Sequence, residues 1–306
     1  MIVASIDIGT NTVLLLIAKV DPGTHKIITL HNEYRMPRIG SGTKQTGIIN
    51  TDKLTLLFDV LSEYDKIIQD FHCDKVILTG TNAFRMAKNT PDIIEEIKSL
   101  FNYELNVVSG EEEAEYAYYG AISNLDDNCF SMVIDIGGSS TEVIIGEGTR
   151  IISKNSLQLG SVSATEQILK NSPPLKAEIE NLGKDIKILF SSIANKITPA
   201  QVIAIAGTAT TLACMKSGLK EFEEVKVDKS IITIEDMKNI IGELFPLTPA
   251  EILERYGPVM RGREDIIFAG AFILYQFMEH FGIETVAVST RGIRYGAIVK
   301  YLENLI

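Results

Sequence analysis

The chain has 306 residues, 45% hydrophobic and 23% charged, and a formal net charge of −11 at pH 7. This composition is typical of a globular protein with room for two domains, and no apolar run approaches the roughly 20 residues of a membrane helix. The acidic balance argues against broad nucleic-acid binding, and the cysteines and histidines show neither disulfide nor zinc-site spacing. Because the first apolar strand begins at Ile2, we expect no signal peptide and a cytoplasmic location.

Strands and helices alternate along the chain, which predicts the α/β class. In the first half we expect strands at 2–8, 12–20, 26–38, 76–78 and 105–108, with helices at 51–71, 91–101 and after Ser109. In the second half we expect strands at 130–136, 141–147, 150–158, 202–206 and 285–288, with helices at 161–170, 175–196, 234–245, 249–256 and 263–281, and after Gly207 and Gly292.

Two of these strands end in nearly the same sequence. The first runs through Asp7 into the turn Gly9, Thr10, Asn11 and Thr12, and the second runs through Asp135 into Gly137, Gly138, Ser139 and Ser140, followed by Glu142. Such a turn offers backbone N–H groups to phosphate oxygens, and the aspartate can hold a cation beside them. One copy alone would be an ordinary turn. Two copies with matching flanks predict two similar lobes that close on one phosphate chain.

A third glycine and hydroxyl turn follows the expected strand at 202–206. Gly207 and Thr208 stand where the next helix opens, and an anion can be bound at a helix N-terminus.

The acidic segment Glu111–Glu113 follows Ser109 directly. Ser109 is a good N-cap, and acidic side chains in a first helical turn are favoured by the helix dipole. Capping therefore explains these glutamates without any chemistry, although it does not exclude one of them from pointing into a cleft.

An acidic protein that binds a polyanion needs either divalent cations carried by the substrate or a local cationic channel. Solvated surface charge remains the alternative interpretation for each basic residue taken alone. The candidates for the channel are Arg35, Arg38, Lys44, Arg85, Lys88, Arg261, Arg263, Arg291 and Arg294.

Eight stretches, in order and spread over nearly the whole chain, resemble motifs of the exopolyphosphatase/guanosine pentaphosphate phosphohydrolase family, which belongs to the actin, hexokinase and heat-shock ATPase superfamily. They are Asp7–Thr12, Arg38–Gly42, Thr81–Arg85, Ser109–Ala114, Asp135–Glu142, Gly207–Thr210, Arg263–Ile267 and Gly292–Gly296. The resemblance implies two actin-like (ribonuclease H-like) lobes with an inter-lobe cleft. We place them at 1–123 and 124–306, joined by a hinge at 120–128, with the last helix returning to the first lobe.

The resemblance also implies an enzyme that uses Mg²⁺ or Mn²⁺ to remove the terminal phosphate from inorganic polyphosphate or guanosine pentaphosphate. The family's catalytic glutamate, the general base for water, falls on Glu112. Its metal-binding acids fall on Asp7, Asp135 and Glu142. Its phosphate-binding positions fall on Gly9, Thr10, Asn11, Thr12, Arg38, Arg85, Gly137, Gly138, Ser139, Ser140, Gly207, Thr208 and Arg263.

The chain departs from the family pattern at several positions. Ser139 replaces the usual third glycine of its turn, and Thr290 and Tyr295 stand where acidic residues are usual. The chain ends at Ile306, without the C-terminal helical domain of longer members, so we expect a preference for shorter polyphosphates.

Three alternatives stay open. The same site could hydrolyse guanosine pentaphosphate, the fold could serve an ATP-dependent kinase or ATPase, or the protein could be a non-catalytic phosphate-chain sensor. A homodimer is the default expectation for a soluble enzyme.

Overall fold

The computed structural model describes residues 1–123, 129–193 and 199–305. Its contacts divide the chain into two compact units. Unit 1 is Met1–Asn124 with Arg291–Ile306, and unit 2 is Leu125–Thr290. The expected hinge at 120–128 and the expected helix end at 196 reach into 124–128 and 194–198, which lie outside the described residues. The inter-lobe cleft stays a prediction.

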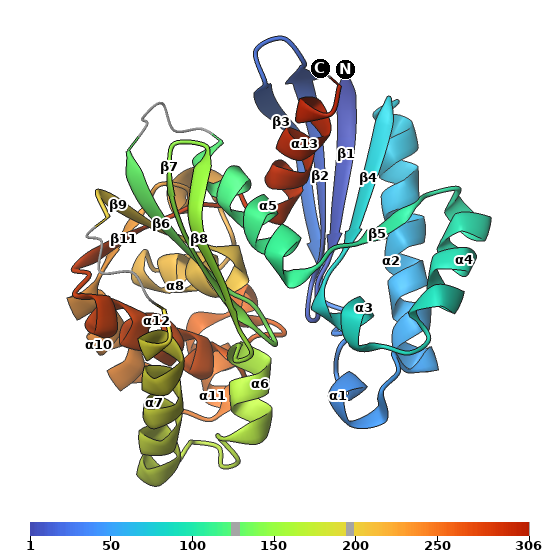
Figure 1. Ribbon diagram of the computed structural model, residues 1–306. Helices are drawn as coiled ribbons and strands as arrows, with labels where there is room; N and C mark the ends of the chain where they lie inside the picture. Colours follow the sequence, from blue (N-terminus) through green and yellow to red (C-terminus); the bar gives the residue numbers. More distant parts are fainter. Residues whose placement is uncertain (124–128, 194–198, 306) are drawn as a thin grey trace. The chain divides into compact units, whose positions relative to one another are not determined.

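Unit 1 is built on one mixed sheet (Figure 1). Its described strands are β1 (Ile2–Ile8), β2 (Val13–Asp21), β3 (Lys26–Arg35), β4 (Lys75–Gly80) and β5 (Leu105–Val107), in the spatial order β3-β2-β1-β4-β5. Its described helices are α1 (Thr43–Thr46), α2 (Thr51–Asp70), α3 (Asn82–Met86), α4 (Thr90–Phe101), α5 (Gly110–Ile122) and α13 (Ile293–Glu303).

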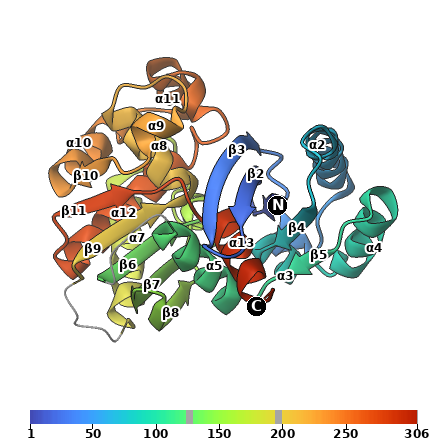
Figure 2. The same ribbon diagram turned by 90° about the horizontal axis from the view of Figure 1, so that it is seen from above.

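The central strand β1 is buried on both faces, as expected for a strand covered from both sides. Ala4, Ile6 and Ile8 pack with the residues of α2 and α4, whereas Val3 packs with those of α13. The view from above places α2 and α4 on one face of this sheet and α13 on the other (Figure 2). Asp7 shares the alternation of Val3 and therefore lies on the α13 face.

Helices α5 and α13 lie side by side, and glycine residues allow their backbones to approach closely (Figure 1). A Cβ atom on Gly120 would come within 2.0 Å of the Gly292 carbonyl oxygen, and one on Gly296 within 1.8 Å of the Tyr116 carbonyl oxygen. The glycines of the last family-like stretch therefore serve close helix packing.

Unit 2 is also built on one sheet, which has more strands than the sheet of unit 1 (Figure 2). Its described strands are β6 (Phe130–Ile136), β7 (Thr141–Glu147), β8 (Arg150–Leu157), β9 (Gln201–Ile205), β10 (Ile231–Thr233) and β11 (Thr285–Val288), in the spatial order β10-β11-β9-β6-β7-β8. Its described helices are α6 (Ser161–Gln167), α7 (Lys176–Ser191), α8 (Ala206–Lys216), α9 (Glu224–Val227), α10 (Ile234–Leu244), α11 (Pro249–Tyr256), the 3₁₀ turn η1 (Pro258–Met260) and α12 (Ile267–Phe281).

One face of the unit 2 sheet carries the main core. Met132, Ile134 and Ile136 alternate on β6 and pack with buried side chains of α7, α8 and α12. Helix α12 is apolar on nearly all sides because it lies within this core.

None of the helices in the described part of the chain has the length and apolar character that a membrane-spanning helix needs.

The expected α/β class is confirmed, and the expected longer elements are present with small shifts. The strand expected to reach 38 ends at Arg35, because Pro37 has no N–H for the ladder and Arg38 adopts a positive φ of 51°. The helix expected from 263 begins at Ile267. The short elements α1, α3, α9 and β10 were not predicted.

Candidate active site

The two duplicated turns adopt the same geometry. In unit 1 the Gly9 N–H donates to the Thr12 carbonyl at 2.9 Å, and in unit 2 the Gly137 N–H donates to the Ser140 carbonyl at 3.0 Å. A Cβ atom on either glycine would meet that same carbonyl oxygen at 3.3 Å. The sequence repeat is therefore also a repeat of local structure.

The turn of unit 2 is fixed from behind by the start of α6. The Gly137 carbonyl accepts from the Ser161 N–H at 2.9 Å, and the Gly138 carbonyl accepts from the Val162 N–H at 2.8 Å. In a planar trans peptide the next N–H points opposite to the carbonyl. The N–H groups that follow these two carbonyls therefore point away from α6, as a phosphate-binding turn requires.

The turn of unit 1 has a comparable support. The Thr10 carbonyl accepts from the Gly40 N–H at 2.9 Å, and the Asn11 carbonyl accepts from the Arg38 N–H at 3.1 Å. A Cβ atom on Gly40 would lie 2.3 Å from Thr10 Cγ2, so only glycine allows this approach. The structure places Arg38 at the back of the turn through its backbone, and its role in substrate binding stays a prediction.

The predicted metal-binding acids lie at the ends of the strands that lead into and out of the turns. Asp7 is 7% exposed and lies beside Thr79 in the β1–β4 pairing. Asp135 and Glu142, 7% and 2% exposed, are direct partners between β6 and β7. Ser156 on β8 donates a hydrogen bond from its hydroxyl to Glu142 Oε1 at 2.9 Å.

This donor set fits a hard divalent cation. Carboxylate oxygens are the protein ligands that Mg²⁺ and Mn²⁺ prefer, and two carboxylates at one point of a sheet favour a cation that offsets their repulsion. Among the described residues, no group of three His, Cys, Asp or Glu side chains gathers closely enough to hold a metal ion.

Glu112, the predicted general base, is an exposed residue in the first turn of α5. One of its oxygens, Oε2, accepts a hydrogen bond from the Ser109 N–H at 2.8 Å, and Ser109 Oγ accepts from the Glu112 N–H at 3.2 Å. This is a capping box, which holds the carboxylate in one orientation. The helix cap and the predicted catalytic role therefore use the same side chain.

Arg85, the predicted phosphate-binding residue, is anchored by a neighbour of Glu112. Its Nη1 donates to Glu113 Oε2 at 2.6 Å and to the Val108 carbonyl at 2.9 Å. Glu113 is 8% exposed, and burial raises the pKa of its carboxyl above the ordinary value, while the Arg85 guanidinium opposes that shift. In the sequence, no local signal distinguishes Glu113 from Glu111.

The third turn brings together two predicted residues that are far apart in the sequence. Gly207 opens α8, and a Cβ atom there would lie 2.0 Å from Arg263 Nη2, so the guanidinium packs directly on the glycine. The Thr208 hydroxyl donates to the Ile136 carbonyl at 3.0 Å. This bond ties the start of α8 to the end of β6, next to the duplicated turn.

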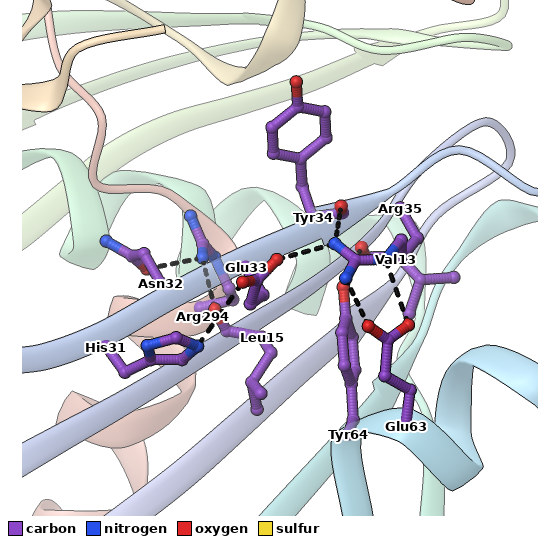
Figure 3. A network of polar contacts seen from close by, with 10 residues as sticks. All are labelled: Val13, Leu15, His31, Asn32, Glu33, Tyr34, Arg35, Glu63, Tyr64 and Arg294. Carbon is purple, nitrogen blue, oxygen red and sulfur yellow. Dashed lines mark hydrogen bonds and ion pairs between the residues drawn. The ribbon is translucent and has the colours of Figure 1, made fainter. Parts of the chain in front are cut away.

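Arg35 and Arg294, from the candidate channel cations, also have partners inside unit 1 (Figure 3). Arg35 pairs with Glu33 and Glu63, and Arg294 donates to Asn32 Oδ1 at 2.8 Å and to the Leu15 carbonyl at 2.9 Å. Both guanidinium groups therefore stabilise the β2–β3 region.

A model of the Ppx/GppA phosphatase family matches residues 16–305. The chain belongs to this family. The expectation of an exopolyphosphatase-type phosphoanhydride hydrolase is thereby confirmed at the level of the family.

Individual relatives match nearly the whole chain. Exopolyphosphatase 2 of Mycobacterium tuberculosis H37Rv is 27% identical over 96% of this chain and 96% of the relative. The guanosine-5'-triphosphate,3'-diphosphate pyrophosphatase of Vibrio cholerae El Tor Inaba is 25% identical over 99% of this chain, which spans 59% of that longer relative.

The fold agrees with a solved structure of the family. The crystal structure of the Aquifex aeolicus Ppx/GppA family member matches with a TM-score of 0.85 and 29% identity, over 100% of this chain and 98% of that one. The expected actin-like fold is confirmed.

Proposed function

We propose that this protein is a metal-dependent exopolyphosphatase that removes the terminal phosphate from inorganic polyphosphate. The observation that carries the proposal is the pair of equivalent turns, at Gly9–Thr12 and Gly137–Ser140, each supported from behind through its carbonyl groups. Such turns bind phosphate oxygens through backbone N–H groups, which suits a substrate made of phosphate.

In the proposed reaction, Glu112 accepts a proton from the attacking water, and the water oxygen bonds to the terminal phosphorus. The bond from that phosphorus to the bridging oxygen breaks, and the oxygen leaves on the shortened chain. Ser109 orients the Glu112 carboxylate by its backbone N–H. Phosphoryl transfer asks the protein mainly for positioning and charge neutralisation, which Arg85 and the turn N–H groups supply.

Asp135 and Glu142 are the residues that would hold Mg²⁺ or Mn²⁺. When bound, the cation neutralises phosphate oxygens and lowers the repulsion between the substrate and these acids. The buried positions of Asp135 and Glu142 on adjacent strands support this assignment.

Inorganic polyphosphate is the first candidate because the relative named an exopolyphosphatase is 27% identical over 96% of this chain. Guanosine pentaphosphate remains the second candidate because its relative matches 99% of this chain at 25% identity.

The test is phosphate release from inorganic polyphosphate, guanosine pentaphosphate and ATP, each with MgCl₂ and with EDTA. We expect release from polyphosphate that requires the metal, slower release from the nucleotide, and none from ATP. Equal or faster release from guanosine pentaphosphate would assign the second candidate. Binding of polyphosphate without release in any condition would indicate a sensor.

A further inference from the structure

Arg85 and Glu113 form a nearly buried ion pair in unit 1. The side chain of Arg85 is 21% exposed and that of Glu113 is 11% exposed, and Nη1 lies 2.6 Å from Oε2. The two residues come from different helices, α3 and α5, and are 28 positions apart.

The guanidinium is fixed at more than one point. Besides Glu113, the same Nη1 donates to the Val108 carbonyl at 2.9 Å, and Nη2 lies 3.5 Å from Asn82 Oδ1. Contacts within α3, with α5 and with the residue segment just before α5 thus determine where the positive charge of Arg85 stands. Two charge-assisted bonds on one terminal nitrogen leave the rest of the planar fork in one orientation.

A buried pair of this kind is a weak device for stability alone, because desolvation of both charges offsets most of their attraction. Burial also raises the pKa of Glu113, so the carboxylate is costly where it stands. Two well-packed apolar side chains would stabilise the fold equally well. The arrangement is better explained by what it does to Arg85.

We infer that Glu113 is a positioning residue that holds the Arg85 guanidinium for the terminal phosphate group of the substrate. The inference rests on the proposed function. It gives two adjacent glutamates of α5 different tasks. Glu112 is exposed and available to water, whereas Glu113 is buried and acts only through Arg85.

The test is a double-mutant cycle with inorganic phosphate as the probe, because this product binds without turnover. Wild type, Glu113→Gln, Arg85→Gln and the double variant are titrated with phosphate in MgCl₂, and the dissociation constant is taken from the rise in unfolding temperature. Circular dichroism checks that each variant is folded. Glu111→Gln is the matched control, since it removes one charge from an exposed residue of the same helical turn.

We expect Glu113→Gln to weaken phosphate binding about 10-fold when Arg85 is present, since small displacements of a positioning group are costly. In the Arg85→Gln background the same change should alter binding less than about twofold, because coupled residues are not additive. Glu111→Gln should leave binding unchanged. Glu113→Asp should restore part of the lost affinity.

Two results would overturn the inference. One is binding that stays within about twofold of wild type in Glu113→Gln, and the other is an equal loss in both Arg85 backgrounds. If the wild type binds phosphate but releases none from polyphosphate, the proposed function fails, and the cycle still decides the role of Glu113. If the wild type binds no phosphate, both fail.

Discussion

Asp135 and Glu142 face each other directly across the β6–β7 ladder, with 7% and 2% of their surfaces exposed. Like charges directly opposite on a sheet are destabilising. The Ser156 hydroxyl satisfies one oxygen of Glu142 but supplies no positive charge. A bound divalent cation would offset the repulsion between these two carboxylates.

Glu142→Gln should remove the response of the protein's stability to metal. The amide oxygen keeps the Ser156 hydrogen bond, while the negative charge that would hold the cation disappears. Thermal unfolding with EDTA and with MgCl₂ or MnCl₂ measures this response. Glu147→Gln, at the exposed end of the same strand, is the control and should keep the metal response. A Glu142→Gln variant that metal still stabilises would contradict the assignment.

Glu112→Gln should reduce phosphate release about 10²- to 10⁴-fold, the usual contribution of a general base. Glutamine also completes a capping box, so α5 should remain intact and polyphosphate binding should be kept. Release assays and a binding titration measure the two properties. Glu111→Gln controls for the loss of one charge in this turn. Turnover near the wild-type rate in Glu112→Gln would show that another group activates the water.

The duplicated turns could be predicted from the sequence because every determinant is local. A buried apolar strand, an aspartate and a turn of glycine and hydroxyl residues together specify the hairpin. In the structure the backbone N–H groups of Gly9 and Gly137 each donate a hydrogen bond to the carbonyl of the third residue along the chain. The positions of Asp135 and Glu142 could be predicted from the same pattern, because the register of the hairpin strands places the two residues opposite one another.

The contacts that hold the site residues in place could not be predicted in the same way. Glu111, Glu112 and Glu113 are equivalent in sequence, and only the packing of α3 against the start of α5 buries Glu113 beside Arg85. Ser156 and Gly160 carry no sequence signal, because their contacts come from strand register and from a tertiary approach to Gly137. The pairing of Arg35 with Glu63 likewise depends on how α2 packs on the sheet.

Gly160→Ala should disturb the turn of unit 2. A Cβ atom at this position would lie 2.6 Å from the Gly137 carbonyl oxygen and 2.7 Å from that of Gly138, so the turn backbone must move. We expect phosphate-chain affinity to fall about 10-fold or more, since a displaced binding group is costly. Titration with polyphosphate and thermal unfolding measure the affinity and the stability.

Gly242→Ala is the matched control for this substitution. Nothing lies within 4 Å of a Cβ atom at this exposed position of α10, so alanine should stabilise the helix by about 0.5–1 kcal/mol. Phosphate-chain affinity should not change in this variant. Wild-type affinity in Gly160→Ala would show that the support by α6 is not required for binding.

The Arg35–Glu63 pair should make part of the stability depend on pH (Figure 3). The hydrogen bonds from Arg35 lower the pKa of Glu63 below its ordinary value of 4.5. Stability from a lowered carboxyl pKa is fully present above that value and is lost as pH falls through the pKa of the folded state. Because the side chains are 35% and 48% exposed, solvent screening limits the contribution to about 0.5 kcal/mol.

Glu63→Gln should therefore be less stable than wild type at pH 7, and the difference should vanish on acidification below 4.5. Urea unfolding at several pH values measures this difference. Glu104→Gln, 86% exposed and 3.4 Å from Lys98, should match wild type throughout. A Glu63→Gln deficit that persists at low pH would show that the pair acts through packing instead of charge.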